Sequence, residues 1–236
     1  MALPVMVTGR SSSGKTYSLK NFKPDEVGIL SIEKGRLPFK TDLKVARVPK
    51  SFSPDTVKQI VEDLGGTYSG GQIDDFRRMN AARYAWIERV IKTSKTKSLV
   101  IDDSQYLLVN EMFDRSGERG YDKFTDMAKN FRNLIHFVNE LEDNDKIVYF
   151  LHHSEADSDG REKVKTIGKM LDEKLTVEGC FDIVLYCADH EFWTQSNGTS
   201  TAKSPEGMFE IKIPNDLKAV DTTIREYYGM TPLAGS

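Results

Sequence analysis

Cysteine is scarce in this sequence, with two residues among 236. Cys180 and Cys187 flank an apolar run, which is typical of small core residues in a reducing compartment and indicates neither a disulfide nor a metal site. No apolar stretch approaches the roughly 20 residues that span a bilayer. The apolar run at the N-terminus is short and lacks the basic flank of a signal peptide. We therefore expect a cytoplasmic protein without a membrane partner.

An excess of either charge is also missing. Lysine and arginine number 33 against 36 acidic residues, so the net charge is −3 and the pI lies near 5.9. Such a chain has no overall attraction for nucleic acid, and any contact with DNA must come from a local basic patch. The chain is long enough to bury a sizeable core.

The segment VMVTGRSSSGKT, residues 5–16, is the most informative part of the sequence. An apolar run ends at Gly9, and Gly14 opens a predicted helix that extends to Phe22. This is the G-x-x-x-x-G-K-[ST] phosphate-binding loop in its strand–turn–helix setting, although a chance turn before a helix is the alternative. The glycines let backbone N–H groups point at phosphate oxygens. The predicted nucleotide-binding residues are Gly9, Arg10, Ser11, Ser12, Ser13, Gly14, Lys15, Thr16 and Tyr17.

Two side chains of this loop and one distant carboxylate have predicted roles. Lys15 is expected to reach the β- and γ-phosphates of ATP, and the Thr16 hydroxyl to bind Mg²⁺. The run SLVIDDS at 98–104 is typical of a strand that delivers a carboxylate to the same ion. Asp102 is the first acid after the apolar run and is our choice for the metal ligand, with Asp103 as the alternative.

The alternation of apolar runs with helical patterns predicts an α/β fold with a mostly parallel central sheet flanked by helices. A single domain is expected over residues 1–236, with a helical insertion at 36–96, a hairpin and edge strands at 190–213, and a loose tail at 229–236. The hairpin is predicted to pair 191–195 with 199–203 across a turn at 196–198. A glycine-rich loop lies at 65–71. The expected strands are 27–32, 44–48, 98–102, 146–151, 181–187 and 208–213, and the expected helices are 53–64, 74–93, 105–142 with a break at 116–120, and 216–228.

Polar residues follow two of the predicted strands. Glu33 lies just past the strand 27–32, where open α/β sheets place groups that contact a ligand. It is a candidate general base for the water that attacks the γ-phosphate, and a solvated acid is the alternative. His152 and His153 end the strand 146–151. Because adjacent strand residues point to opposite faces and no third ligand is spaced nearby, a γ-phosphate sensor is favoured over a metal site.

The polar segment 156–169 contains the candidate basic patch. It is either a solvated loop or a mobile basic loop that contacts the phosphates of DNA. Its basic residues are Arg161, Lys163, Lys165 and Lys169.

Five segments together resemble a RecA-type ATPase core, and most closely the phage-encoded RecA-like ATPases of the single-strand annealing family. They are GRSSSGKT, ILSIEKG, LVIDDS, VYFLHH, and AKSPEGMF followed by IPNDL, and the resemblance covers nearly the whole chain. It implies a P-loop ATPase that requires ATP and Mg²⁺ and acts on single-stranded DNA, which can stimulate turnover. It also implies single-strand-binding protein as a partner, a homo-oligomer, and Glu33 and His153 (or His152) as catalytic residues.

Three departures from that family's pattern are visible. Lys203 corresponds in place to the lysine of a lysine-plus-arginine element that related ATPases insert into a neighbouring subunit's site. Pro205 stands at the arginine position, so the resemblance implies a catalytic Lys203 acting in trans and no such arginine. Tyr17 follows the loop where relatives usually carry a small hydroxyl residue. Because the first strand starts near residue 3, filaments of the RecA kind are not expected.

Two other function classes stay open. A P-loop kinase for a nucleotide or other small acceptor would carry an arginine-rich lid, whereas 156–169 holds one arginine. A non-catalytic, nucleotide-gated adaptor or loader of a replication protein would share the phosphate loop but not the turnover.

Overall fold

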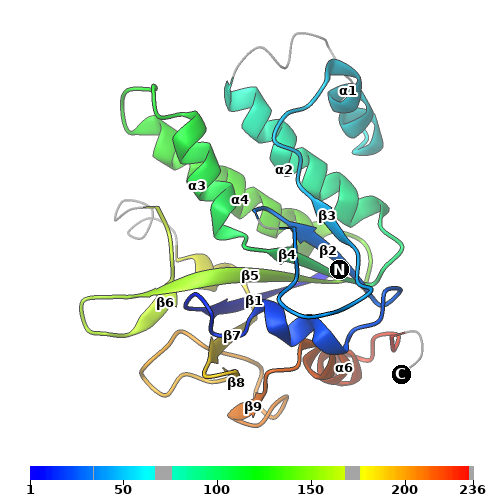
Figure 1. Cartoon of the computed structure of the whole chain (residues 1–236), viewed down its shortest axis with the longest axis vertical. Coiled ribbons are helices and arrows are strands. Elements are labelled where there is room, and N and C mark those ends of the chain that lie inside the picture. Colours follow the sequence, from blue (N-terminus) through cyan, green and yellow to red (C-terminus); the bar gives the residue numbers. More distant parts are fainter. Residues whose placement is uncertain (34, 67–75, 168–175, 234–236) are drawn as a thin grey trace.

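A central β-sheet with strand order β3-β2-β4-β5-β1-β7-β8-β9 organises the protein (Figure 1). The computed structural model describes residues 1–33, 35–66, 76–167 and 176–233. Strands from β3 to β7 run parallel, whereas β8 and β9 add antiparallel, and β6 pairs antiparallel with the end of β5. The strands are β1 (Leu3–Gly9), β2 (Val27–Ser31), β3 (Val45–Arg47), β4 (Ser98–Asp102), β5 (Ile147–Ala156), β6 (Glu162–Val164), β7 (Ile183–Ala188), β8 (Glu191–Trp193) and β9 (Lys212–Pro214).

Helices cover both faces of this sheet, as Figure 1 shows. On one face lie α2 (Phe76–Thr93), α3 (Gln105–Asp114) and α4 (Asp122–Glu140), with α1 (Pro54–Asp63) packed on α2. On the other face lie the 3₁₀ helix η1 (Thr16–Asn21) and α6 (Leu217–Tyr228). A further 3₁₀ turn, η2 (Val177–Cys180), leads into β7. The predicted α/β fold with a mostly parallel sheet flanked by helices is confirmed.

The two-sided cover explains why the central strands read as continuous apolar runs. In β1, Met6 packs in the core that contains Phe131 of α4, whereas Val5 and Val7 pack in the core that contains Leu19 of η1. All three β1 side chains are 0% exposed. A parallel strand buried on both faces needs an apolar residue at every position, and this is the pattern that made the strands recognisable.

Local signals set the ends of two helices as expected. The Ser53 hydroxyl accepts a hydrogen bond from the backbone N–H of Thr56, and Pro54 follows it at the first helical position of α1. Asp216 caps α6 in the same way, and α6 ends at Gly229 with a φ of 66°. The break predicted at 116–120 separates α3 from α4.

Two expectations about local structure were wrong or incomplete. The helix after the phosphate loop is six residues of 3₁₀ helix rather than a longer α-helix. The segment 156–169 is not a loop throughout, because β5 continues five residues past Leu151 and pairs with β6 as a hairpin. The short strand predicted at 44–48 is confirmed as the edge strand β3.

The predicted hairpin partner of 191–195 was also wrong. β8 pairs with β7 and with β9, and residues 199–203 form single bridges elsewhere, from Ser200 to Glu162 and from Lys203 to Val184. The turn signal at 196–198 is real, since Gly198 has a φ of 91°. The strand ladder is decided by the sheet edge at β7, which already offers β8 an unpaired backbone. The glycine-rich loop at 65–71 lies mostly outside the described residues.

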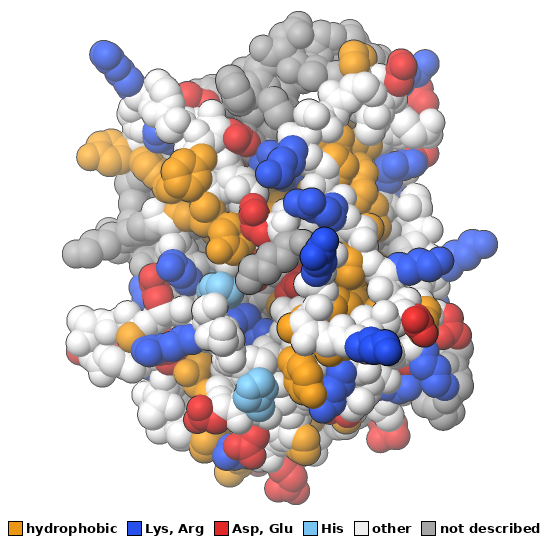
Figure 2. All heavy atoms as spheres, viewed as in Figure 1, with side chains coloured by type: hydrophobic (Ala, Val, Ile, Leu, Met, Phe, Trp, Pro, Cys, Tyr) orange, Lys and Arg blue, Asp and Glu red, His pale blue; other side chains and the backbone are white. Residues whose placement is uncertain are grey.

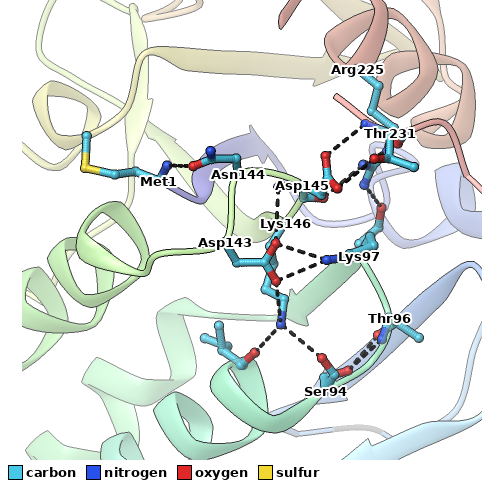
Figure 3. Close-up of polar contacts among 12 residues, drawn as sticks. Met1, Ser94, Thr96, Lys97, Asp143, Asn144, Asp145, Lys146, Arg225 and Thr231 are labelled. Carbon is cyan, nitrogen blue, oxygen red and sulfur yellow. Dashed lines mark hydrogen bonds and ion pairs between the residues drawn. The ribbon is translucent and has the colours of Figure 1, made fainter. Parts of the chain in front are cut away.

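The tail predicted to be loose is anchored over its described part. Thr231 donates to Asp145 from both its backbone N–H (2.9 Å) and its hydroxyl (2.7 Å), and Leu233 is 6% exposed (Figure 3). Figure 3 also shows Asp143 between Lys97 and Lys146, and the N-terminal amine on Asn144. The N-terminus and Thr231 are thus both held at the end of the sheet where the parallel strands begin.

Surface charge is uneven. On the face drawn in Figure 2, lysine and arginine side chains gather in a band down the middle, and acidic side chains lie mainly toward the lower and right-hand rim. A chain with net charge −3 can therefore still present a locally basic surface. Among the helices that the structure describes, none is both long and apolar enough to cross a membrane.

Candidate functional site

The loop between β1 and η1 has the curled backbone that an anion site needs. Ser12 has a φ of 63° and Gly14 a φ of 108°, both in the left-handed region. A Cβ atom at Gly9 would lie 2.4 Å from the Cys187 carbonyl oxygen, and one at Gly14 would lie 2.5 Å from Nδ2 of Asn215. Both glycines are therefore required by close approach of β7 and of the segment before α6, in addition to the turn itself.

Lys15 lies in the centre of this loop. Its Nζ donates to the backbone carbonyls of Gly9 (2.7 Å) and Arg10 (2.8 Å), and the residue is only 6% exposed. The ammonium group is thus held at the mouth of the loop by the loop's own carbonyl oxygens. A phosphate oxygen is a charged acceptor and makes a stronger hydrogen bond to Lys15 than a neutral carbonyl does.

Thr16 and Asp102 meet beside Lys15. The Thr16 hydroxyl donates to Oδ1 of Asp102 at 3.0 Å, although the residues are 86 positions apart in the sequence. Burial, and then the neighbouring charge of Asp103, raise the pKa of Asp102 to about 6. A buried carboxylate with a raised pKa lacks sufficient positive charge around it, and a bound cation would supply that charge.

A hollow of about 320 Å³ lies over the loop. Asp103 borders it just after β4, His153 borders it from within β5, and His190 borders it from the turn after β7. Nε2 of His153 lies 3.4 Å from Oδ1 of Asp103. Asp103 is held with a φ of 61°, an uncommon value for a residue with a side chain. The remaining lining comes from Ser11, Ser12, Ser13, Gly14, Lys15, Thr16, Tyr17 and Pro38.

The two adjacent histidines separate as their position on a strand predicts. His153 faces the hollow, whereas His152 is 0% exposed and lies on the other face of β5. Nε2 of His152 donates to the Lys165 carbonyl (2.8 Å), and its Nδ1 lies 2.9 Å from the Ser104 hydroxyl. Burial lowers the pKa of His152 to about 4, so it is neutral near pH 7. His153 stays the candidate sensor, and His152 ties β5 to the hairpin.

Glu33 lies at the end of β2, the strand next to β4. Ser31 pairs in register with Asp102, so Glu33 projects just beyond the predicted metal ligand. Its Oε1 accepts a hydrogen bond from Nδ2 of Asn110 in α3 at 2.9 Å, and it does not line the hollow over the loop. Its predicted role as general base stays a prediction.

The basic segment lies on the β5–β6 hairpin, beside the loop. Glu162 and Val164 are buried (6% and 2% exposed), so the alternating residues Arg161, Lys163 and Lys165 belong to the opposite face of the hairpin. Arg161 also donates from Nε to the Ser200 carbonyl at 3.2 Å. The fourth predicted DNA contact, Lys169, lies outside the described residues.

One ion pair links this hairpin to the phosphate loop. Nε of Arg10 donates to Oε1 of Glu162 at 2.6 Å, and Oε2 of Glu162 accepts from the Ser154 hydroxyl at 2.5 Å. The Arg10 side chain is 65% exposed while that of Glu162 is 7% exposed. A movement of the loop can therefore reach β6 through a single side-chain pair.

Lys203 lies away from the loop of its own chain. Its backbone exchanges two hydrogen bonds with Val184 (2.9 and 2.8 Å), and Val184 pairs with Met6, three residues before Gly9. Three strand residues correspond to about 10 Å. A catalytic role for Lys203 within the same chain has no geometric support, and its action on a neighbouring subunit stays a prediction.

Three residues that hold the loop were not predicted from the sequence. Nδ2 of Asn215 donates to the Gly14 carbonyl (2.9 Å), and both the His190 backbone N–H (3.3 Å) and the Cys187 thiol (3.2 Å) donate to the Ser13 carbonyl. They lie 174 to 201 positions from the loop residues they contact, so no local sequence pattern predicts these contacts. The segment IPNDL, which contains Asn215, was the available signal.

The donor set fits magnesium held between protein and phosphate. Within the described ranges, no group of three or more His, Cys, Asp or Glu side chains is arranged to hold a metal ion. Mg²⁺ needs no such cage, because it is usually bound by one or two protein oxygens together with phosphates and water. Thr16 and Asp102 would provide those oxygens, and the buried Ser13 hydroxyl has no hydrogen-bond partner among the described residues.

Comparisons with known proteins give a family match and likenesses to solved structures. A family model described as an AAA domain matches residues 1–208. No curated protein matches the sequence. A chain from a solved structure, described as that of a DnaB-like replicative helicase and its interactions with primase, has 16% sequence identity and a TM-score of 0.38. The similarity covers 78% of this chain and 46% of that one, so this chain spans less than half of the helicase chain's length.

Proposed function

Because this chain belongs to the AAA domain family, whose model it matches over residues 1–208, we propose that it is a magnesium-dependent ATPase acting on single-stranded DNA. The observation that carries the proposal is that Lys15 and Thr16 line one hollow and that Asp102 is hydrogen-bonded to Thr16 beside it. A cationic side chain, a hydroxyl and a carboxylate in that arrangement are what a nucleoside triphosphate with its metal requires.

Side chains that line the hollow, together with Asp102 and Glu33 near it, have separate roles in hydrolysis. Lys15 leaves the carbonyls of Gly9 and Arg10 to contact the β- and γ-phosphates, and the loop N–H groups bind the remaining oxygens. Thr16 and Asp102 hold Mg²⁺, which when bound neutralises negative charge on the phosphates. Glu33 accepts the proton of the attacking water, and His153 detects whether the γ-phosphate is present.

The contact with DNA is proposed for the basic face of the β5–β6 hairpin. Arg161, Lys163 and Lys165 share that face. Such a row of cations can contact successive phosphates of a single strand. The Arg10–Glu162 pair connects the hairpin to the phosphate loop. Nucleotide binding that moves Arg10 would therefore change the position of the basic face, which gives a physical route for coupling ATP to DNA.

The finer role that we propose is annealing or recombination of single strands, in a phage, alongside single-strand-binding protein in the host cytoplasm. It rests on the resemblance of the motifs to that ATPase family. A homo-oligomer follows from the same proposal, since Lys203 pairs with Val184 of β7, away from the phosphate loop of its own chain, and could act only on a neighbouring subunit's nucleotide.

Phosphate release with and without single-stranded DNA tests the enzymatic part. The wild type should hydrolyse ATP only with Mg²⁺, and faster with DNA, while a panel of acceptor nucleotides should accept no phosphate. Transfer to an acceptor would identify a kinase instead. Nucleotide binding without turnover, with or without DNA, would identify an adaptor.

Titration of a labelled oligonucleotide at several salt concentrations, with a non-hydrolysable ATP analogue, tests the DNA part. Arg161→Ala combined with Lys163→Ala should lower affinity and flatten the salt dependence by a slope of about 0.7 per lost contact. The matched control is Lys92→Ala with Lys95→Ala, which removes two exposed cations at the end of α2 and just after it, where the chain approaches the beginning of β4. Parallel lines with one intercept for wild type and hairpin variant would exclude this hairpin as the DNA site.

A further inference from the structure

A second hollow adjoins the one over the phosphate loop and has no role in the chemistry described so far. Its volume is about 670 Å³, and it shares Tyr17 and His190 with the first hollow. Beyond these two rings it is bordered by polar side chains of η1 and of the segment before α6, including Lys20, Asn21 and Asn215.

The direction of a bound nucleotide follows from the sheet. Asp102 ends β4, Asp103 follows it, and His153 lies in the neighbouring strand β5, so the metal and the γ-phosphate belong on that side of the loop. β1 lies between β5 and β7, and the turn after β7 carries His190. The α-phosphate end must therefore point toward Tyr17 and His190, where the second hollow opens.

The two rings form a corner at this opening. The Tyr17 and His190 ring centroids are 6.0 Å apart with an interplanar angle of 87°, and Phe39 packs edge-on against Tyr17 at 5.9 Å. Lys20 lies 4.6 Å from the Tyr17 ring centroid. Tyr17 is 37% exposed, and a planar base could pack with a face on one ring and an edge against the other.

The backbone that holds His190 is strained. Asp189 and His190 are consecutive residues with φ values of 51° and 59°, a conformation that costs free energy for residues with side chains. The hydrogen bond to the loop uses only the His190 backbone N–H. Within the described residues, nothing hydrogen-bonds to the His190 ring nitrogens, so loop support alone does not explain why the turn carries an imidazole.

We infer that this second hollow binds the nucleoside half of the nucleotide, with the base against the rings of Tyr17 and His190. The inference rests on the proposed ATPase function and specifies which part of ATP each hollow takes. The phosphate loop then supplies affinity for any triphosphate, and the Tyr17–His190 corner supplies the additional affinity for a triphosphate that carries a base.

A comparison of two probes tests the inference. Dissociation constants are measured with Mg²⁺ for ATP and for inorganic tripolyphosphate, which lacks base and ribose. His190→Asn should weaken ATP binding about tenfold, the loss expected for one stacked base, and leave tripolyphosphate binding within about twofold. Asparagine adopts left-handed backbone readily, so the turn is kept. His190→Phe keeps an aromatic face and should restore most of the ATP affinity.

The controls separate this inference from the proposed function. His136→Ala removes a histidine on α4 and should change neither constant, and Lys15→Ala should weaken both probes. If the wild type binds neither probe, the ATPase proposal itself fails. If the wild type binds both and His190→Asn weakens them equally, or leaves ATP unaffected, then His190 only supports the loop and the nucleoside inference is overturned.

Discussion

Lys15 and Lys146 occupy opposite ends of the same parallel sheet in closely similar local states. Lys15 is 6% exposed and donates to the carbonyls of Gly9 and Arg10, while Lys146 is 2% exposed and donates to the carbonyls of Ile91 (2.7 Å) and Ser94 (3.0 Å). The carbonyls bonded by Lys146 belong to the last turn of α2 and to the residue just after it, groups that the helix itself leaves without partners. Lys15 itself borders a hollow that water or a phosphate can enter.

The carboxylates at the two ends of the sheet also differ, because their pKa values are shifted in opposite directions. At the edge where strands begin, burial acts to raise the pKa of Asp143, but hydrogen bonds from Lys97 and from the Asp145 backbone outweigh it, and the pKa is lowered. The backbone and hydroxyl of Thr231 lower the pKa of Asp145. At the edge where strands end, burial and Asp103 raise the pKa of Asp102 to about 6.

The beginning of the sheet is thus a polar network that satisfies itself. Buried Asp221 of α6 pairs with Arg225 and also accepts from Tyr149 (2.9 Å) and from Ser98 (2.6 Å). At the other end, buried charge is left partly uncompensated around a hollow. Polar groups that satisfy one another stabilise the fold, whereas polar groups that need a further partner bind a ligand.

Among the substitutions that test this difference between the two ends of the sheet, Lys15→Ala should have the largest effect, and that effect is on turnover. Lys15→Ala should lower ATP hydrolysis by a factor on the order of 100 or more, because it removes the one side-chain cation that the loop places on the β/γ-phosphates. Its free energy of unfolding should fall by no more than about 1 kcal/mol, since water can reach the carbonyls of Gly9 and Arg10. Unchanged ATP affinity and turnover in a folded variant would contradict the nucleotide site.

Glu33→Gln should bind ATP and Mg²⁺ as the wild type does and hydrolyse ATP on the order of 100-fold more slowly. The amide keeps the shape and can still accept the hydrogen bond from Asn110, but it cannot accept the proton of the attacking water. Single-turnover measurements separate binding from hydrolysis. Equal rates for both proteins would move the general base to Asp103, and Asp103→Asn is the matched variant.

Lys146→Ala should act on stability instead. The substitution leaves the Ile91 and Ser94 carbonyls without their donor in a buried site, which should lower the free energy of unfolding by about 2 to 3 kcal/mol. Urea denaturation measures this loss, and turnover of the folded protein should be unchanged. If turnover fell as far as in Lys15→Ala while stability held, the division between the two ends would be wrong.

Asp102→Asn should stabilise the protein slightly near pH 7 while weakening its response to Mg²⁺. Because the pKa of Asp102 is raised to about 6 in the folded protein, the folded state binds a proton that the unfolded chain has already released between about pH 4 and pH 6. Wild-type stability from this group therefore falls as pH rises through that window, and near pH 7 the folded state bears the full penalty. Removing the charge should raise the free energy of unfolding by about 1 kcal/mol.

Urea denaturation near pH 7 and near pH 5 checks this sign, and the gain from Asp102→Asn should be smaller at the lower pH. Asp103→Asn is the control for the metal, and it should weaken the Mg²⁺ dependence of turnover less than Asp102→Asn does. The reverse order would mean that Asp103 is the metal ligand and that the predicted strand end is displaced by one residue.

The sequence by itself determined the central sheet and the phosphate loop. The strands were readable because each is apolar at consecutive positions, and Gly9, Gly14, Lys15 and Thr16 were readable because their spacing is local to one turn. Helix ends at Ser53 and Asp216 were also local, since a capping side chain bonds backbone only two or three residues away.

Only the tertiary structure decided which distant groups meet the loop. Asp102 reaches Thr16 because β4 and β1 both border β5. Asn215, Cys187 and His190 reach the loop because β7 is the other neighbour of β1, the strand that the loop follows. The hairpin of β5 with β6, and the pairing of β8 with β9 rather than with residues 199–203, depended on which sheet edges were available. Pairing between strands far apart in the chain leaves no periodic trace in either segment, because it is settled by the packing of the whole sheet.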